Sequence, residues 1–365
     1  MNVPFLDPAI TDEDIRSVVK AIASGWLVAG QETKRFEESF ARYLGAKAAV
    51  FTSSCTAALH ISLVLAGVSR GDEVITTPLS YVATSNPILY CGAVPVFVDV
   101  EPDTGLIVPQ AVEKAITRRT KAIIPVHLYG QMADMKRLSG IAKKHHLTIV
   151  EDAAHAIEAQ RDGARAGALS LAACFSFHVA KNITSGQGGC IVTNREQLAR
   201  KAILMRRDGV RNVGDRRVME RLGYKYQGTE FQAAMLTSQL DRIDQQWSVR
   251  KQLWQYYAER FRLIEGVSFP QVAEGAKHAY HMFIIWVNAK KRDMMRKALA
   301  SVGIETSIHY NPIHLEPYYR RAFGYRKGDL PIAESLGAAT ITLPLPLKMT
   351  KEQQDYVVRT IERLV

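Results

Sequence analysis

The sequence predicts an α/β protein, with a large domain built on a mostly parallel sheet flanked by helices and a smaller C-terminal α+β domain. From about residue 48 to residue 195, short apolar runs alternate with stretches of helical pattern. Strands that alternate with helices in this way form a parallel sheet covered on both faces. The chain has 365 residues, 47% of them hydrophobic, so it can bury one large core or a large and a small one.

The large domain is expected to span residues 1–245, and short apolar segments are expected to supply its sheet. The predicted strands cover residues 48–54, 73–78, 95–100, 121–130, 147–154, 173–178 and 188–194. Helical patterns between them cover residues 56–67, 85–90 and 134–145. Ligands of such sheets gather at the carboxyl ends of the strands, and the chemically interesting residues of this chain fall there.

A long amphipathic helix is predicted over residues 230–255, where it would link the large domain to the small one. The small domain is expected to span residues 246–365. It contains an apolar run at 278–287, a helical pattern at 291–303 and another helical pattern at 350–365. This mixture of strand and helix indicates an α+β arrangement.

The charge of the chain favours an anionic partner. There are 47 Lys and Arg against 36 Asp and Glu, a net charge of +11. The segment 200–225 holds nine of the basic residues and three of the acidic ones. One local cluster suits a phosphorylated ligand better than a long polyanion, although a solvated basic loop would look the same.

The cysteines indicate whether the protein binds a metal and in which compartment it works. Four cysteines, Cys55, Cys91, Cys174 and Cys190, lack any spacing typical of metal ligands, so no metal is predicted. They lie in apolar or small-residue runs, as free thiols do in a reducing, cytoplasmic compartment.

The N-terminal residues lack the pattern of a signal peptide, and no stretch approaches the roughly 18 apolar residues of a membrane span. We therefore expect a cytoplasmic protein that does not cross a membrane.

Two segments place polar groups at the ends of predicted strands. SSCTAAL, residues 53–59, turns from a strand into a helix, and N–H groups at a helix N-terminus attract phosphate. An ordinary helix cap remains an alternative. EDAAH, residues 151–155, directly follows an apolar strand. A carboxylate there is costly unless it is paired, so it is either a cap or the partner of a protonated pyridine nitrogen.

Lys181 is the candidate nucleophile. It follows a strand of bulky residues and precedes a Gly-rich turn in FSFHVAKNITSGQGG, residues 175–189. Desolvation lowers the pKa of a lysine, so that its amine attacks carbonyl groups, although a lysine before a glycine turn is usually a solvated loop residue. With the acidic strand end and the phosphate-type turn, Lys181 completes what pyridoxal phosphate (PLP) needs: an amine, a carboxylate for the ring nitrogen and a phosphate cradle.

Taken in order, these motifs resemble the DegT/DnrJ/StrS family of PLP-dependent nucleotide-sugar aminotransferases over essentially the whole chain. The matching segments are residues 25–47, 53–60, 96–104, 151–156, 175–189 and 308–319. Details such as FSFHVAKNIT, LGYKY and HAYHMFIIWV are similar to the branch of UDP-4-amino-4-deoxy-L-arabinose aminotransferase. The resemblance implies the aspartate-aminotransferase-like fold of PLP enzymes.

The resemblance also implies roles around the cofactor ring. Lys181 would bond covalently to PLP and act as the catalytic residue. Asp152 would pair with the pyridinium nitrogen, and His155 would lie near the phenolic oxygen of the ring. Tyr81 would stack on the ring face.

The phosphate of the cofactor would be held, by the same resemblance, by Cys55 and Thr56 at the turn and by the Ser176 hydroxyl. Lys225 matches a residue that reaches the phosphate bound by the neighbouring subunit. The resemblance therefore implies a homodimer with shared active sites.

The implied reaction transfers an amino group from L-glutamate to a keto group, at C4, of a nucleotide-linked keto-sugar, with His309 and Tyr310 near the sugar. Amination of a 3-keto nucleotide sugar or of a keto-cyclitol is an alternative that shares every cofactor residue. A more distant alternative is a non-catalytic, basic regulatory or DNA-binding protein. No helix-turn-helix or zinc-finger pattern supports nucleic-acid binding, so we expect none.

Three positions depart from the family pattern. Cys55 replaces a glycine in the phosphate turn, Gln187 replaces an acidic residue in the Gly-rich turn, and Glu158 replaces a glycine after EDAAHA. Because Asp152 and Lys181 are intact, we expect these departures to bear on substrate choice more than on reaction type.

Overall fold

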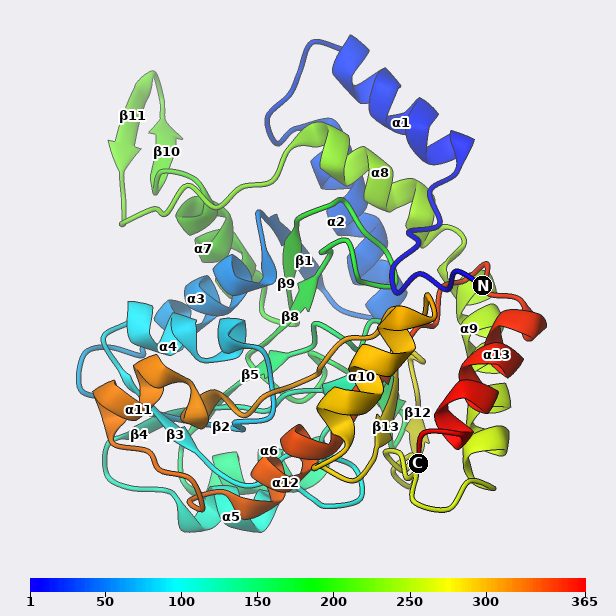
Figure 1. Cartoon of the computed structure of the whole chain (residues 1–365). Helices are drawn as coiled ribbons and strands as arrows, with labels where there is room; N and C mark the ends of the chain where they lie inside the picture. Colours follow the sequence, from blue (N-terminus) through cyan, green and yellow to red (C-terminus); the bar gives the residue numbers. More distant parts are fainter.

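The computed structural model describes residues 1–365, and its centre is a seven-stranded sheet of order β1-β9-β8-β5-β4-β2-β3 (Figure 1). Its strands are β1 Ala48–Thr52, β2 Glu73–Thr76, β3 Val94–Phe97, β4 Thr120–Ile124, β5 Thr148–Asp152, β8 Ala172–Ser176 and β9 Gly189–Thr193. Neighbouring strands are parallel, except that β9 runs antiparallel to both β1 and β8. The predicted α/β fold with a mostly parallel sheet is confirmed.

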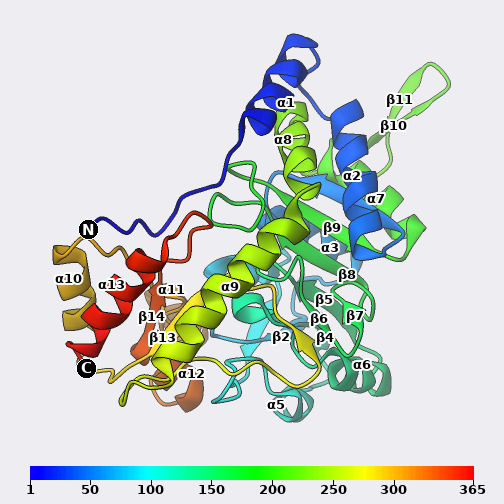
Figure 2. The same cartoon turned by 90° about the vertical axis from the view of Figure 1, so that its right-hand side faces the viewer.

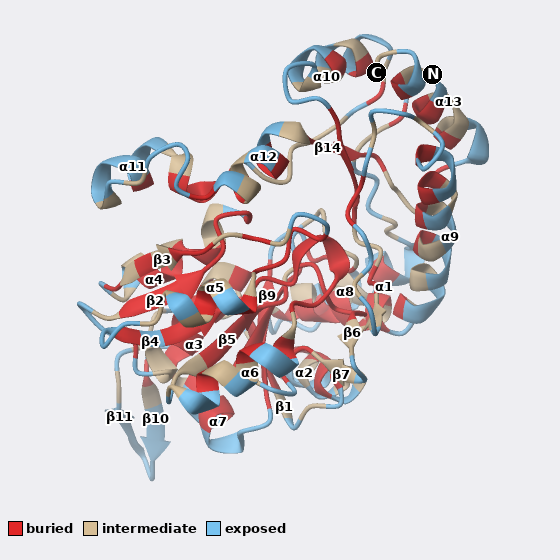
Figure 3. Cartoon of the chain, turned by 90° about the horizontal axis from the view of Figure 1, so that it is seen from below, coloured by how far each residue is buried: buried red, intermediate tan, exposed pale blue.

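Helices cover both faces of this sheet. The helices of the large part are α1 Asp12–Ala23, α2 Gln31–Leu44, α3 Cys55–Leu65, α4 Asn86–Tyr90, α5 Pro109–Lys114, α6 Met135–Lys144, α7 Glu196–Arg206 and α8 Glu230–Leu240. Alternate residues of a strand enter opposite cores: Phe51 packs with α2, α6 and α8, whereas Val50 packs with α3, α4 and α7. The strands are accordingly buried while the outer faces of the helices meet solvent (Figure 3).

The helix predicted over residues 230–255 is wrong as a single element. The chain forms α8 and then α9 (Ile243–Phe261), with a break at Asp241 and Arg242. The Arg242 side chain turns back from this break to the Asp14 carboxylate, with Nη1 2.9 Å from Oδ1, and it also donates to the Ser238 carbonyl. The break lets α9 run diagonally away from the sheet toward the C-terminal part (Figure 2).

The C-terminal part of the chain packs around a hydrophobic cluster of its own, formed by side chains of α9, β13, α10, β14 and α13. Its elements are β13 Phe283–Trp286, α10 Arg292–Ser301, α11 Pro317–Phe323, α12 Pro331–Ala339, β14 Thr340–Leu343 and α13 Lys351–Glu362. Val3, from the start of the chain, is buried in the same cluster. The division into 1–245 and 246–365 stays a prediction.

The remaining strands are short and lie outside the central sheet. They are β6 Gln160–Arg161, β7 Ala164–Arg165, β10 Val210–Val213, β11 Arg216–Met219 and β12 Ala276–Lys277. β10 and β11 form a hairpin that projects from the body of the protein (Figure 1). None of the helices has both the length and the apolar character that crossing a membrane would require.

The basic segment 200–225 divides into buried and exposed charges. Arg206, at the end of α7, is buried against the Glu37 carboxylate and the Phe51 carbonyl. Arg211 and Glu220 form an ion pair on the exposed hairpin. Part of the basic segment is therefore structural, and the rest lies in solvent where it can meet an anion.

Replacing Arg206 with methionine is expected to lower the free energy of unfolding by about 3–5 kcal/mol, because the buried Glu37 would lose its charge partner. Urea unfolding measures this change. Arg211→Met, which breaks the exposed pair with Glu220, is the control and is expected to cost less than about 1 kcal/mol. Equal effects of the two substitutions would contradict the assignment of Arg206 to the structural core.

Candidate active site

A cavity of about 680 Å³ opens at the carboxyl ends of the parallel strands. Segments that follow β1, β2, β4, β5 and β8 all contribute to its lining, as expected for a sheet of this type. The cavity brings together nine of the predicted site residues, which are Cys55, Thr56, Tyr81, Asp152, His155, Ser176, Lys181, His309 and Tyr310. The first seven come from the large part of the chain, and the last two come from the segment between α10 and α11.

Lys225 does not lie in this cavity. It follows the β10–β11 hairpin, its side chain is 67% exposed, and its Nζ is 3.3 Å from the Asp208 carboxylate. Within one chain, Lys225 forms no hydrogen bond or ion pair with the other predicted residues. Its predicted role across a subunit boundary stays a prediction.

Lys181 lies in the loop that follows β8. Burial lowers the pKa of its amine from the usual 10.5 to about 8, while the nearby Asp152 and Cys55 act in the opposite direction. A lysine with such a pKa has a substantial fraction of neutral amine near neutral pH, and the neutral amine is both a nucleophile and a base. Lys181 thus differs from a solvated loop lysine, the alternative that the sequence left open.

Asp152 ends β5, and its carboxylate is buried at the cavity wall. Its Oδ1 accepts a 3.2 Å hydrogen bond from the Ala154 N–H, and its Oδ2 accepts a 2.7 Å bond from the Thr84 hydroxyl. Burial raises the pKa of this carboxyl, and the Thr84 bond lowers it in part. Asp152 therefore caps the next turn and also faces the cavity, so the two interpretations of the EDAAH motif are compatible.

Thr84 is a site residue that the sequence analysis missed. Its hydroxyl is 2.6 Å from the Ser80 hydroxyl and donates to Asp152, so it fixes the orientation of the carboxylate. Both hydroxyls belong to the short segment between β2 and α4, whose small polar residues carry no motif. Only the parallel pairing of the strands brings this segment next to β5.

The turn into α3 has the features of an anion site. The Ser54 side chain caps the helix by accepting a bond from the Ala57 N–H, 3.1 Å away. The N–H groups of Cys55 and Thr56 have no partner inside the helix, because the first N–H groups of any helix lack one. A Cβ on Gly189 would lie 2.4 Å from the Cys55 nitrogen, so only glycine lets β9 pass this close to the turn.

Of the three residues that depart from the family pattern, Cys55 and Gln187 line the cavity and Glu158 does not. The Cys55 thiol donates to the Cys174 carbonyl at 3.5 Å, so its sulfur lies against β8. Gln187 is exposed, and its carbonyl accepts bonds from the Ser185 hydroxyl and the Gln232 amide. Glu158 is fully buried and forms an ion pair with Arg250.

His155 lines the cavity and packs among other aromatic side chains. Its Nε2 lies 3.1 Å from the Tyr310 hydroxyl, and its ring centroid is 4.7 Å from that of His281. Burial and the nearby Lys181 hold the pKa of His155 well below its usual value, so the ring is neutral. It acts as a hydrogen-bonding and stacking surface rather than as a cation. His281 was not predicted as a site residue.

The arrangement fits PLP. The cavity supplies a half-buried amine of lowered pKa, a buried carboxylate and a helix N-terminus with free N–H groups, and it is large enough for a cofactor and part of a substrate. The Nδ1 atom of His155 is buried without a partner, which leaves one polar atom available to a bound group. Amine, carboxylate and anion cradle together match the three parts of PLP.

This fold and this set of side chains define a PLP-dependent aminotransferase. The chain belongs to the DegT/DnrJ/EryC1/StrS aminotransferase family, whose sequence pattern matches residues 8–362. It is 36% identical over 377 residues to the spore coat polysaccharide biosynthesis protein SpsC of Bacillus subtilis, covering 100% of this chain and 97% of that one.

Solved structures agree with this assignment. The PLP form of Spr1654 from Streptococcus pneumoniae superimposes with a TM-score of 0.95 at 30% identity, covering 100% of this chain and 98% of that one. PseC of Helicobacter pylori, an aminotransferase involved in the biosynthesis of pseudoaminic acid, superimposes with a TM-score of 0.94 at 28% identity, covering 100% and 99%. The chain is thus an aminotransferase of this family that uses PLP.

Proposed function

We propose that this enzyme moves an amino group from L-glutamate to the C4 keto group of a nucleotide-linked keto-sugar, as the UDP-4-amino-4-deoxy-L-arabinose branch of the family does. The observation that carries the proposal is the meeting of the Lys181 amine and the Asp152 carboxylate in one cavity beside a free helix N-terminus. The choice of C4 and of a nucleotide sugar rests on the similarity of residues 175–184, 222–226 and 278–287 to that branch.

The proposed cofactor contacts follow from the positions of the side chains. Asp152, oriented by Thr84, would hold the pyridine nitrogen in its protonated form. Cys55 and Thr56 would hold the phosphate through their backbone N–H groups, with Ser176 adding its hydroxyl. His155 and Tyr81 both line the cavity and would flank the ring.

The reaction needs one residue that bonds covalently to the cofactor and also transfers protons, and Lys181 has the properties for both. When bound, PLP supplies an electron-withdrawing ring that stabilises the negative charge left after proton removal. Lys181 Nζ would take the proton from the α-carbon of the amino donor and release it to the carbon on the other side of the amino nitrogen. A pKa of about 8 lets the amine both accept and release a proton near neutral pH.

Selection of the sugar is proposed to involve His309 and Tyr310. The Tyr310 hydroxyl contacts His155, and the His309 Nδ1 lies 2.8 Å from the Thr342 hydroxyl, so both rings are fixed at the cavity wall. Exposed arginines of the hairpin, such as Arg216 and Arg217, would attract the diphosphate of the nucleotide. This electrostatic contribution weakens as salt is added.

A homodimer with shared active sites is part of the proposal. Several large apolar residues between α1 and α2 are exposed in the single chain, namely Trp26, Leu27 and Val28, and Tyr81 at the cavity is 61% exposed. A second copy would cover them and would bring its Lys225 toward the phosphate site. Sedimentation velocity of the purified protein tests this, and a monomer at working concentration would contradict it.

The proposed substrate is tested by supplying L-glutamate together with one keto compound at a time. A UDP-linked 4-keto-pentose is expected to be aminated faster than a 3-keto nucleotide sugar or a keto-cyclitol, and 2-oxoglutarate release measures each rate. Preference for a 3-keto sugar or for the cyclitol would replace the C4 assignment while leaving the aminotransferase in place.

A further inference from the structure

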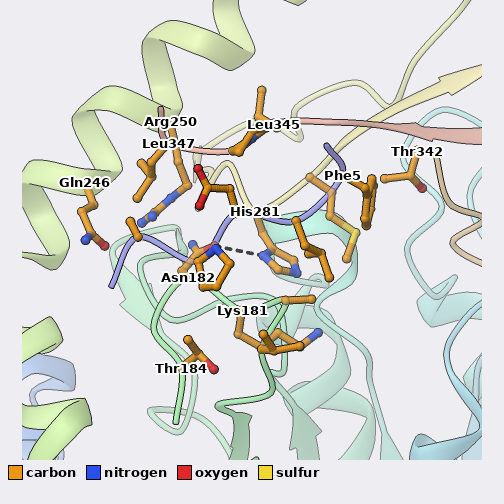
Figure 4. A pocket seen from close by; sticks show the side chains of 18 of the residues that line it. Phe5, Lys181, Asn182, Thr184, Gln246, Arg250, His281, Thr342, Leu345 and Leu347 are labelled. Carbon is orange, nitrogen blue, oxygen red and sulfur yellow. Dashed lines mark hydrogen bonds between the residues drawn. The ribbon is translucent and has the colours of Figure 1, made fainter. Parts of the chain in front are cut away.

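A second, smaller cavity of about 100 Å³ also reaches Lys181 (Figure 4). Residues 5–9, the loop after β8, the start of α9 and the segment after β14 line it. Lys181 and Met282 belong to the walls of both cavities. The smaller cavity contains a cluster of polar side chains, the buried Arg250 and the half-buried Asn182 and His281, to which the proposed reaction assigns no role.

Glu158 contacts two members of this cluster, Arg250 and Asn182. Its carboxylate is fully buried and is neutralised by Arg250, which is also buried. The Asn182 amide nitrogen donates to both carboxylate oxygens, at 3.0 Å and 2.8 Å, and over a longer distance to the Ala279 carbonyl, at 3.3 Å. An ionised carboxylate accepts hydrogen bonds and donates none, so the NH₂ group of Asn182 must face Glu158. The amide oxygen of Asn182 must therefore face the other way.

The orientation of Asn182 in turn sets the tautomer of His281. The Asn182 oxygen lies 2.9 Å from the His281 Nδ1, and because this oxygen can only accept, Nδ1 must carry the proton (Figure 4). Burial and the nearby Lys181 hold the pKa of His281 well below its usual value, so the ring carries a single proton. Its Nε2 is then a bare acceptor, and this atom is buried without a hydrogen-bond partner.

We propose that Glu158 is a positioning residue which, through Asn182, fixes His281 as a hydrogen-bond acceptor for the Lys181 amine. The acceptor would hold the amine, directly or through one water molecule, when the lysine is not bonded to the cofactor. A glycine at position 158 would have no side chain with which to orient Asn182. The proposal rests on the role of Lys181 in the proposed function.

The test reads the tautomer of His281 directly, by ¹⁵N NMR of protein labelled at histidine nitrogens. Wild-type protein is expected to show His281 protonated at Nδ1, and the signal is assigned by its loss in His281→Asn. In the double variant Glu158→Gln/Arg250→Met, which removes both charges at similar volume, the Nδ1–H form is expected to give way to a mixture or to the Nε2–H form. The control is Glu37→Gln/Arg206→Met, which removes a buried ion pair elsewhere and is expected to leave the His281 signal unchanged.

A wild-type His281 protonated at Nε2, or a tautomer that is unchanged in the Glu158→Gln/Arg250→Met variant, would overturn the proposal. Asn182→Ala serves as a second variant with the same expectation, should the double variant not fold. In the same variants kcat is expected to fall about 10- to 100-fold with little change in KM, because the amine would be less well placed. The NMR result does not depend on turnover, so an enzyme inactive on keto-sugars would refute the proposed function without deciding the tautomer.

Discussion

Replacing Lys181 with alanine is expected to reduce amino transfer by about 10⁴-fold. Lys181 is the only lysine among the residues that line the main cavity, so no neighbouring amine can take its place. The amination rate with L-glutamate and a keto-sugar measures the effect, and an unchanged thermal unfolding temperature shows that the variant folds.

The Lys181→Arg variant distinguishes the effect of the positive charge of Lys181 from the effect of its ability to transfer a proton. Arginine keeps a positive charge but stays protonated at all accessible pH values, so it can neither attack a carbonyl nor accept a proton. We expect this variant to be as inactive as Lys181→Ala. Activity of either variant within tenfold of the wild type would remove Lys181 from its catalytic role.

Replacing Asp152 with asparagine is expected to reduce turnover by about 10³-fold while the cofactor remains bound. Asparagine has nearly the same shape and can still accept the bond from the Thr84 hydroxyl, but it carries no charge to keep a pyridine nitrogen protonated. Turnover and cofactor content are measured on the same preparation, so loss of binding is distinguished from loss of chemistry.

Thr84→Val is the matched comparison for Asp152→Asn. It removes only the hydroxyl that orients the carboxylate, so the charge remains and the expected loss is about tenfold. Near-normal turnover of Asp152→Asn would contradict the proposed role of this carboxylate in keeping the pyridine nitrogen protonated. Equal losses in the two variants would mean that orientation, rather than charge, is what the site requires.

The strands and most of the site could be predicted from the sequence because local signals were sufficient. Short apolar runs followed by small or polar residues locate β1, β5 and β8, and the parallel topology then gathers the residues after them at one edge. This is how Cys55, Asp152 and Lys181, far apart in the chain, could be expected in one cavity. The resemblance to the family added the individual roles, which composition and spacing do not supply.

Features that depend on contacts between distant segments could not be predicted. The break between α8 and α9 depends on Arg242 reaching Asp14, 228 residues away, and no local helix breaker marks it. Glu158 could be recognised as a departure, but its pairing with Arg250, 92 residues away, is visible only in three dimensions. Thr84 likewise becomes a site residue only because β2 and β5 lie on either side of β4.

The central claim, that Lys181 holds PLP and that L-glutamate is the amino donor, is tested most directly by one absorbance experiment. The visible spectrum of the purified protein, supplied with PLP where needed, is recorded before and after L-glutamate is added. We predict a yellow protein whose visible band disappears with L-glutamate, and no such disappearance in Lys181→Ala. A protein that stays colourless with PLP would contradict the account and would favour a binding or regulatory role for the same fold.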